Sequence, residues 1–193
     1  MKMKIKVSFF GVLMLLALVF THSYLSIAAL LAALLHELGH IVAAKICDIP
    51  LKEIRLDIFG AAITPQKAFC SYKKEIALAA AGPIVNAVSV FVLFPFFNGL
   101  CEFVKLFVVA SLFLGALNLL PISDFDGGRI LYCMVAYKSS PEVAFAVCRV
   151  ISFVIAFFLW TFSIYLLLRL GASLSLFVFS FALLCKLLMA AKN

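Results

Sequence analysis

The chain has 193 residues, of which 66% are hydrophobic and 13% are charged, and its formal net charge is +7. Soluble domains are about half apolar and about a quarter charged, so this composition excludes an ordinary soluble fold and indicates a membrane protein. The excess positive charge is expected to orient the chain in a lipid bilayer and to attract anionic lipid, and we predict no nucleic-acid partner.

Apolar runs along the chain predict about six transmembrane helices, because a helix needs about 20 apolar residues to cross the hydrocarbon core. The runs cover residues 5–20, 24–46, 75–97, 102–120, 142–168 and 172–190. The first run resembles a signal peptide, but no small-x-small cleavage pattern follows it, so we interpret it as a helix. We therefore predict an all-α polytopic membrane protein with a single membrane-embedded domain over residues 1–193 and no separate soluble domain.

The positions of lysine and arginine predict how these helices are oriented. With a cytoplasmic N-terminus, six spans place every lysine and arginine on the cytoplasmic side except Lys105 and Arg169. Because this bias is the main determinant of orientation, we expect both termini in the cytoplasm.

Residues 50–65 have a different pattern, in which apolar and other side chains alternate before a break at Gly60. Alternation with period two and a glycine break predict a short β-hairpin, which the topology places near the cytoplasmic side. At bilayer depth such backbone persists only where protein covers it or where it lines a polar cavity.

The second apolar run contains the sequence HELGH at residues 36–40. His36 and His40 lie four residues apart on one helical face and can reach one ion, with Glu37 between them. Zinc held by two histidines and a third protein ligand keeps a position for water, whose pKa falls to about 7, and the glutamate accepts the proton. Ionisable groups inside an apolar helix are costly unless they are paired or functional. The motif therefore predicts a zinc-dependent hydrolase.

The third ligand is expected among the few acids in apolar or helix-end context, which are Asp48, Asp57, Asp124 and Asp126. Asp126 is favoured because Pro121 and the double glycine after Asp126 are expected to break the fourth helix and let loop backbone approach the site. Asp124 is the alternative ligand. It is only two residues away, and its alternative role is that of a solvated loop acid.

Three motifs in a fixed order resemble those of the site-2 protease family, the intramembrane zinc metalloproteases of the peptidase M50 type. They are HELGH at residues 36–40, AGPIVN at residues 81–86 and NLLPISDFDGG at residues 118–128. The resemblance covers residues 27–131. The helix plan, the cytoplasmic site and the small size look most like the bacterial subgroup that contains the stage IV sporulation protein FB, which processes a sigma-factor precursor.

The resemblance implies one zinc ion bound by His36, His40 and Asp126, with Glu37 as the general base. It also implies hydrolysis of membrane-associated protein substrates near the cytoplasmic face of a bacterial cell membrane. Membrane-protein regulators are further expected partners. Phe125 departs from the family, which usually has leucine before Asp-Gly, and this puts the substrate in doubt rather than the metal site.

Substrate contacts are the second implication of the resemblance. They fall on Asn118 and Asn86, and on the hairpin around Gly60, which would hold the substrate as an extended strand. From the residues alone, Gly82-Pro83 can equally be a helix kink, with Asn86 as an interhelical hydrogen-bonding residue.

Two other functions fit parts of the sequence. A membrane zinc transporter or sensor would use the same ligands, but a transport path would distribute them over several depths and does not need Glu37. A catalytically inactive membrane binding module would typically lose Glu37 or a ligand, and all four residues are present.

Overall fold

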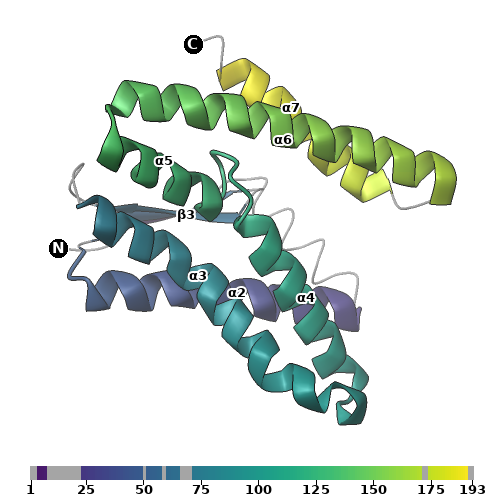
Figure 1. Cartoon of the computed structure of the whole chain (residues 1–193). Coiled ribbons are helices and arrows are strands. Elements are labelled where there is room, and N and C mark those ends of the chain that lie inside the picture. The colour runs from purple at the N-terminus through teal and green to yellow at the C-terminus, as the bar shows by residue number, and fades with distance from the viewer. Residues whose placement is uncertain are drawn as a thin grey trace. The chain divides into compact units, whose positions relative to one another are not determined.

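The structure is a computed structural model that describes residues 4–7, 23–49, 51–57, 60–65, 71–170 and 174–190. Within these residues it contains six α-helices, labelled α2 to α7, three short strands and one 3-10 helix (Figure 1). The chain divides into two compact units, Met1–Leu119 and Leu120–Asn193.

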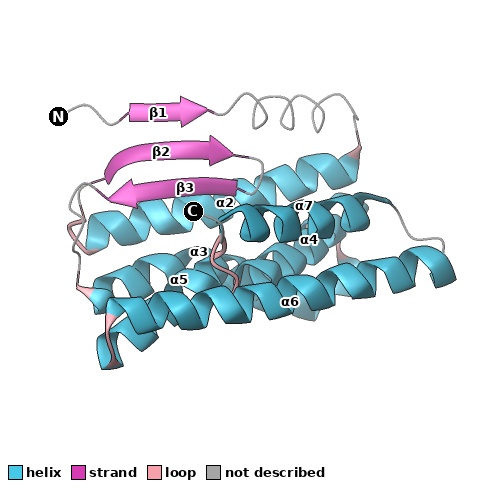
Figure 2. Ribbon diagram, turned by 90° about the horizontal axis from the view of Figure 1, so that it is seen from above, coloured by secondary structure: helices cyan, strands magenta, loops and turns pink. Residues whose placement is uncertain are grey.

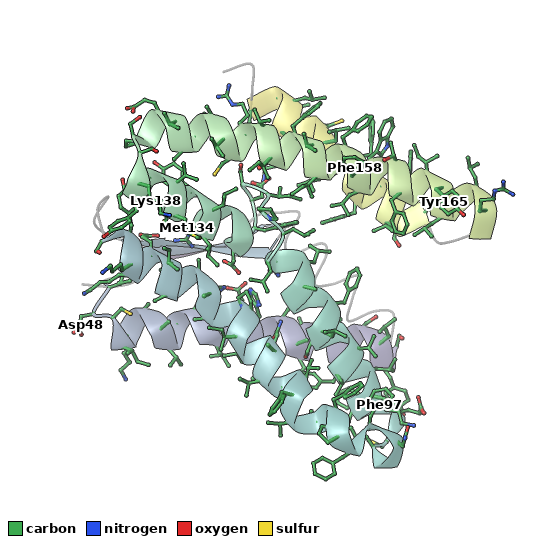
Figure 3. The ribbon with its side chains drawn as sticks, in the orientation of Figure 1. Asp48, Phe97, Met134, Lys138, Phe158 and Tyr165 are labelled. Atoms are coloured by element: carbon green, nitrogen blue, oxygen red, sulfur yellow. The ribbon has the colours of Figure 1, made fainter. Side chains whose placement is uncertain are left out.

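Three helices that pack against one another form most of the first unit (Figure 1). They are α2 (Tyr24–Ile46), α3 (Tyr72–Leu93), which continues into the 3-10 helix η1 (Phe94–Gly99), and α4 (Glu102–Asn118). Ser23 caps the start of α2, where its hydroxyl accepts a hydrogen bond from the Leu25 amide at 3.3 Å. At the other end Asp48 adopts a left-handed conformation with φ 52°, which ends the helix (Figure 3).

The buried face of α2 is made of small and polar side chains, and the large apolar side chains of this helix lie mostly outside. On α2 the buried face consists of Ala28, Ala32, His36, Gly39, His40 and Ala44. Its exposed residues include Leu31, Leu34, Leu38, Ile41 and Val42. This is the pattern of a helix that packs closely against its neighbours in lipid, where large apolar groups gain nothing from burial in protein.

A three-stranded sheet belongs to the same unit and has the order β1-β2-β3 (Figure 2). Its strands are β1 (Lys4–Val7), β2 (Leu51–Asp57) and β3 (Gly60–Pro65). The strand β2 pairs in parallel with β1 and antiparallel with β3, and Asp57 lies opposite Gly60 where β3 begins. The β2–β3 pair lies in the segment for which the sequence predicts a hairpin; residues 50, 58 and 59 lie outside the described residues.

The second unit contains α5 (Asp126–Lys138), α6 (Pro141–Leu170) and α7 (Leu174–Ala190). Both α5 and α7 pack against α6. Between α6 and α7 the buried hydroxyls of Ser163 and Ser180 are hydrogen-bonded at 2.9 Å. Large side chains such as Phe158 and Tyr165 project from α6 (Figure 3), so this unit also places aromatic groups on its outside.

Among the described residues, three helices are long and apolar enough to cross a membrane: Tyr24–Ile46, Tyr72–Gly99 and Pro141–Arg169. The chain is an integral membrane protein with a largely helical fold. Five of the six predicted helices correspond to α2, α3 with η1, α4, α6 and α7.

The first predicted helix has no counterpart among the described helices, and the described helix α5 corresponds to no predicted helix. For the first predicted helix, residues 5–7 lie in β1 instead, and residues 8–20 lie outside the described residues. The sixth described helix is α5, which the sequence did not predict. The double glycine, Gly127 and Gly128, was expected in a loop and lies in the first turn of α5.

Candidate metal centre

His36 and His40 lie on the buried face of α2, and their rings converge on one point. They are 4% and 5% exposed. The two Nε2 atoms are 3.2 Å apart, and the ring planes are inclined by 81°. Two ligands at about 2.0–2.1 Å on a tetrahedral zinc ion lie about 3.3–3.4 Å from each other. The separation of the two nitrogens therefore suits a shared ion.

Gly82 of α3 leaves room beside both nitrogens. A Cβ atom at this position would lie 2.5 Å from Nε2 of His40 and 2.7 Å from Nε2 of His36. Real Cβ atoms do not approach other atoms so closely, and any side chain here would fill the space next to the two nitrogens. The helix α3 therefore forms one wall of a cradle that only glycine keeps open.

A backbone carbonyl fixes the ring of His40. Its Nδ1 atom donates a hydrogen bond to the carbonyl oxygen of Leu78 at 2.8 Å. With the proton on Nδ1, the Nε2 atom of the neutral ring carries the lone pair that a metal needs. Leu78 is itself held in a buried cluster with Ala44 and Ile49 at the end of α2, so the acceptor and the ring are positioned by the same packing.

Glu37 follows His36 directly on α2. The residue is half-buried, and its Oε2 atom is buried. A carboxylate at this position next to a metal site can accept a proton from water.

Asp126 begins α5 in the second unit and is half-buried. The turn before it is fixed by a hydrogen bond from the Phe125 amide to the Ile122 carbonyl at 2.8 Å. Phe125 and Ile122 are both buried, so the residue that departs from the family pattern is an apolar anchor of this turn. A Cβ at Gly128 would collide with the Ile122 carbonyl, and the turn therefore needs glycine at that position.

Two helices of the second unit, α6 and α7, form hydrogen bonds and an ion pair with the same turn. The hydroxyl of Ser152 on α6 accepts a hydrogen bond from the Ser123 amide at 2.9 Å and lies 2.9 Å from the Ser123 hydroxyl. Lys186 on α7 forms an ion pair with Asp124 at 2.8 Å. The carboxylate of Asp124 is thus paired with a lysine, whereas Asp126 is the first residue of α5.

A comparison with models of protein families found a match to this chain. The model of peptidase family M50 matches residues 24–99 and 95–161, which is more than half of the chain and includes the histidine pair, Gly82 and Asp126. The chain belongs to peptidase family M50. It is accordingly a metallopeptidase of the membrane.

One solved structure with the same fold is the site-2 protease from Methanocaldococcus jannaschii. The TM-score is 0.72 and the sequence identity is 22%, over 96% of the M50 peptidase described here and 89% of the archaeal chain. At this identity the likeness concerns the fold. A search of curated proteins found no match.

Three further residues were predicted to contact substrate in this M50 peptidase, and the structure shows where each of them lies. Asn86 is 1% exposed, and its amide nitrogen lies 3.3 Å from Nδ1 of His36. Asn118 ends α4 and donates a hydrogen bond to the Leu114 carbonyl of its own helix at 3.1 Å. Gly60 begins β3. Of the three, only Asn86 is shown here in contact with a predicted ligand.

Two parts of the centre were not predicted from the sequence. They are the cradle at Gly82 and the Leu78 carbonyl. The Gly-Pro pair in α3 was the available signal, because Pro83 cannot donate to the carbonyl four residues earlier and glycine permits close helix contact. No side-chain pattern marks a backbone carbonyl such as that of Leu78.

Proposed function

We propose that this M50 peptidase is an intramembrane zinc protease that cuts membrane-associated proteins near the cytoplasmic face, with one ion held by His36, His40 and Asp126. The observation that carries the proposal is the pair of Nε2 atoms, 3.2 Å apart beside a glycine wall. Asp126 belongs to the second unit and is proposed as the third ligand from the order of motifs in the sequence.

Asp126 is proposed as the third ligand in preference to Asp124. The carboxylate of Asp124 is bound to Lys186, which lowers its availability to a metal. The half-buried position of Asp126 in a turn anchored by Phe125 suits a ligand better, because a metal site needs ligands that are already fixed in place.

The chemistry follows from the donor set. Zinc at this centre would polarise the scissile carbonyl and lower the pKa of a water to about 7. Glu37 then accepts the proton of the attacking water and passes it to the departing amide nitrogen. His40 keeps its proton on Nδ1 throughout, because the Leu78 carbonyl accepts it.

The substrate is proposed to bind as an extended strand. The order β1-β2-β3 leaves β3 with a partner on one side only among the described strands. An edge of this kind can pair with a substrate backbone whatever its side chains. Gly60 at the start of β3 would let the substrate approach closely, and Asn118 would contact the reacting group.

Orientation, partners and biological role are further parts of the proposal. The lysine and arginine bias supports cytoplasmic termini in a bacterial cell membrane. A regulatory precursor, such as a sigma-factor precursor in sporulation, is the substrate that the sequence resemblance suggests, and membrane-protein regulators are the expected partners.

The test compares zinc content and cleavage in detergent-purified wild type, Glu37→Gln and His36→Ala. Cleavage is measured on co-expressed membrane-tethered substrates. We expect near-stoichiometric zinc in wild type and Glu37→Gln, zinc loss in His36→Ala, and cleavage in wild type alone. Cleavage by Glu37→Gln at the wild-type rate would refute the mechanism, and bound zinc without cleavage of any substrate would favour a sensor or transporter.

A further inference from the structure

Asn86 lies against the side of His36 that faces away from the candidate metal position. Its Nδ2 atom is 3.3 Å from Nδ1 of His36, and the residue is 1% exposed. Gly115 of α4 backs it closely, since a Cβ there would lie 3.2 Å from Cβ of Asn86. The amide is therefore enclosed between α3 and its neighbouring helices.

The contacts of the two histidines form a connected chain. His40 donates from Nδ1 to the Leu78 carbonyl, so its Nε2 atom is an acceptor. When no ion is bound, a proton on Nε2 of His36 can be donated to Nε2 of His40, 3.2 Å away. This leaves Nδ1 of His36 as an acceptor, which the Nδ2 group of Asn86 satisfies.

An ion bound by both Nε2 atoms requires the opposite arrangement at His36. The proton must move to Nδ1, because Nε2 now supplies its lone pair. The group facing Nδ1 must then accept a hydrogen bond. Asn86 can do this after a half-turn of its amide, because the amide carries an acceptor and a donor of similar size.

The present orientation also leaves the acceptor atom of the amide unused. Oδ1 of Asn86 is buried and has no hydrogen-bond partner within the described part of the chain. The half-turn gives this oxygen the Nδ1 proton of His36. The resulting bond is the stronger of the two, because a metal-bound imidazole is polarised and donates better than an amide.

We propose that Asn86 is a positioning residue for the metal: its amide accepts a hydrogen bond from Nδ1 of His36 when the ion is bound and donates to Nδ1 when it is not. The inference rests on the proposed zinc site. It gives a specific task to the asparagine of the AGPIVN motif, and it is a different role from contacting substrate.

Two substitutions separate this role from packing. Asn86→Asp keeps the shape and the acceptor but removes the donor, and Asn86→Leu keeps the approximate volume and removes both. Ser89→Ala is the matched control, because Ser89 lies one turn further along α3 and its hydroxyl donates to the Val85 carbonyl of its own helix at 2.9 Å. All variants are made in the Glu37→Gln background, so that activity plays no part in the measurement.

The first readout is zinc affinity, measured by competition with a chelator. We expect Asn86→Leu to weaken zinc binding about 10- to 100-fold, as is usual when a hydrogen-bond partner of a metal ligand is lost. We expect Asn86→Asp to bind at least as tightly as the parent, and Ser89→Ala to match the parent. Parental affinity in Asn86→Leu, or equal weakening in Asn86→Asp and Asn86→Leu, would overturn the inference.

The second readout is the position of the proton on His36, observed by nitrogen-15 NMR of ring-labelled histidine. In the parent, the proton should lie on Nε2 without metal and on Nδ1 with zinc. In Asn86→Asp, it should lie on Nδ1 in both states, and an unchanged metal-free tautomer would contradict the proposal. A parent protein that binds no zinc would instead refute the proposed function, so the two failures are distinguishable.

Discussion

Gly82→Ala should remove zinc binding by filling the space beside the two histidine nitrogens. The added methyl carbon would lie 2.5 Å from Nε2 of His40. Ordinary van der Waals contact begins near 3.4 Å, so the imidazole rings, or the two helices that carry and face them, would have to shift by about 0.9 Å. Such a shift would also lengthen the 2.8 Å hydrogen bond between His40 and the Leu78 carbonyl.

Two opposing contributions to the stability of Gly82→Ala show that the substitution is unfavourable. Alanine is favoured over glycine inside a helix by about 1 kcal/mol, whereas overpacking a close contact costs about 1–3 kcal/mol. Because both imidazoles are displaced, we expect zinc affinity to fall at least about 100-fold, the upper end for loss of one outer contact.

The assay is zinc affinity by chelator competition, together with thermal unfolding in detergent. Gly99→Ala is the control, because a Cβ at Gly99 meets nothing within 4 Å. This variant should keep parental zinc affinity. If Gly82→Ala binds zinc as tightly as the parent, then α3 does not form a wall of the metal centre and the proposed cradle is wrong.

Two further predictions concern the turn before α5. Asp126→Ala should lose zinc, while Asp124→Asn should keep it because Asp124 is already paired with Lys186; elemental analysis of the purified variants decides between them, and the reverse pattern would make Asp124 the ligand. Ser152→Ala should lower the free energy of unfolding by about 1–3 kcal/mol, because it removes the acceptor of the Ser123 amide. Thermal unfolding measures the loss, and Thr161→Ala, which changes an exposed hydroxyl on the same helix, should leave stability nearly unchanged.

The long helices could be predicted from the sequence because their apolar runs are bounded by polar groups and breaks. The bounds of α2 agree with the prediction at both ends. The helix α5 was missed because it is too short to span a membrane and contains charged residues and a double glycine. Its glycines were interpreted as loop residues, whereas Gly128 is required by close contact with the Ile122 carbonyl.

The histidine pair could be predicted because both residues and their spacing lie within one turn of helix. The contact between Asn86 and His36 joins residues 50 positions apart, and its partner atom could not be identified without coordinates. The ion pair of Asp124 was equally inaccessible, since Lys186 lies 62 residues away. The histidine pair could therefore be predicted from the sequence, but the side chains that contact His36 and Asp124 lie on other helices.

The small side chains on the buried face of α2 also affect how its packing should respond to cold. Soluble helix bundles are held by burial of large apolar groups, and that driving force weakens on cooling. Here α2 presents alanine, glycine and histidine to its neighbours, while its leucines lie outside. The packing of α2 against its neighbours therefore depends mainly on close van der Waals contact and hydrogen bonds. A helix packed in this way should keep its contacts at temperatures where a helix of a soluble bundle begins to loosen.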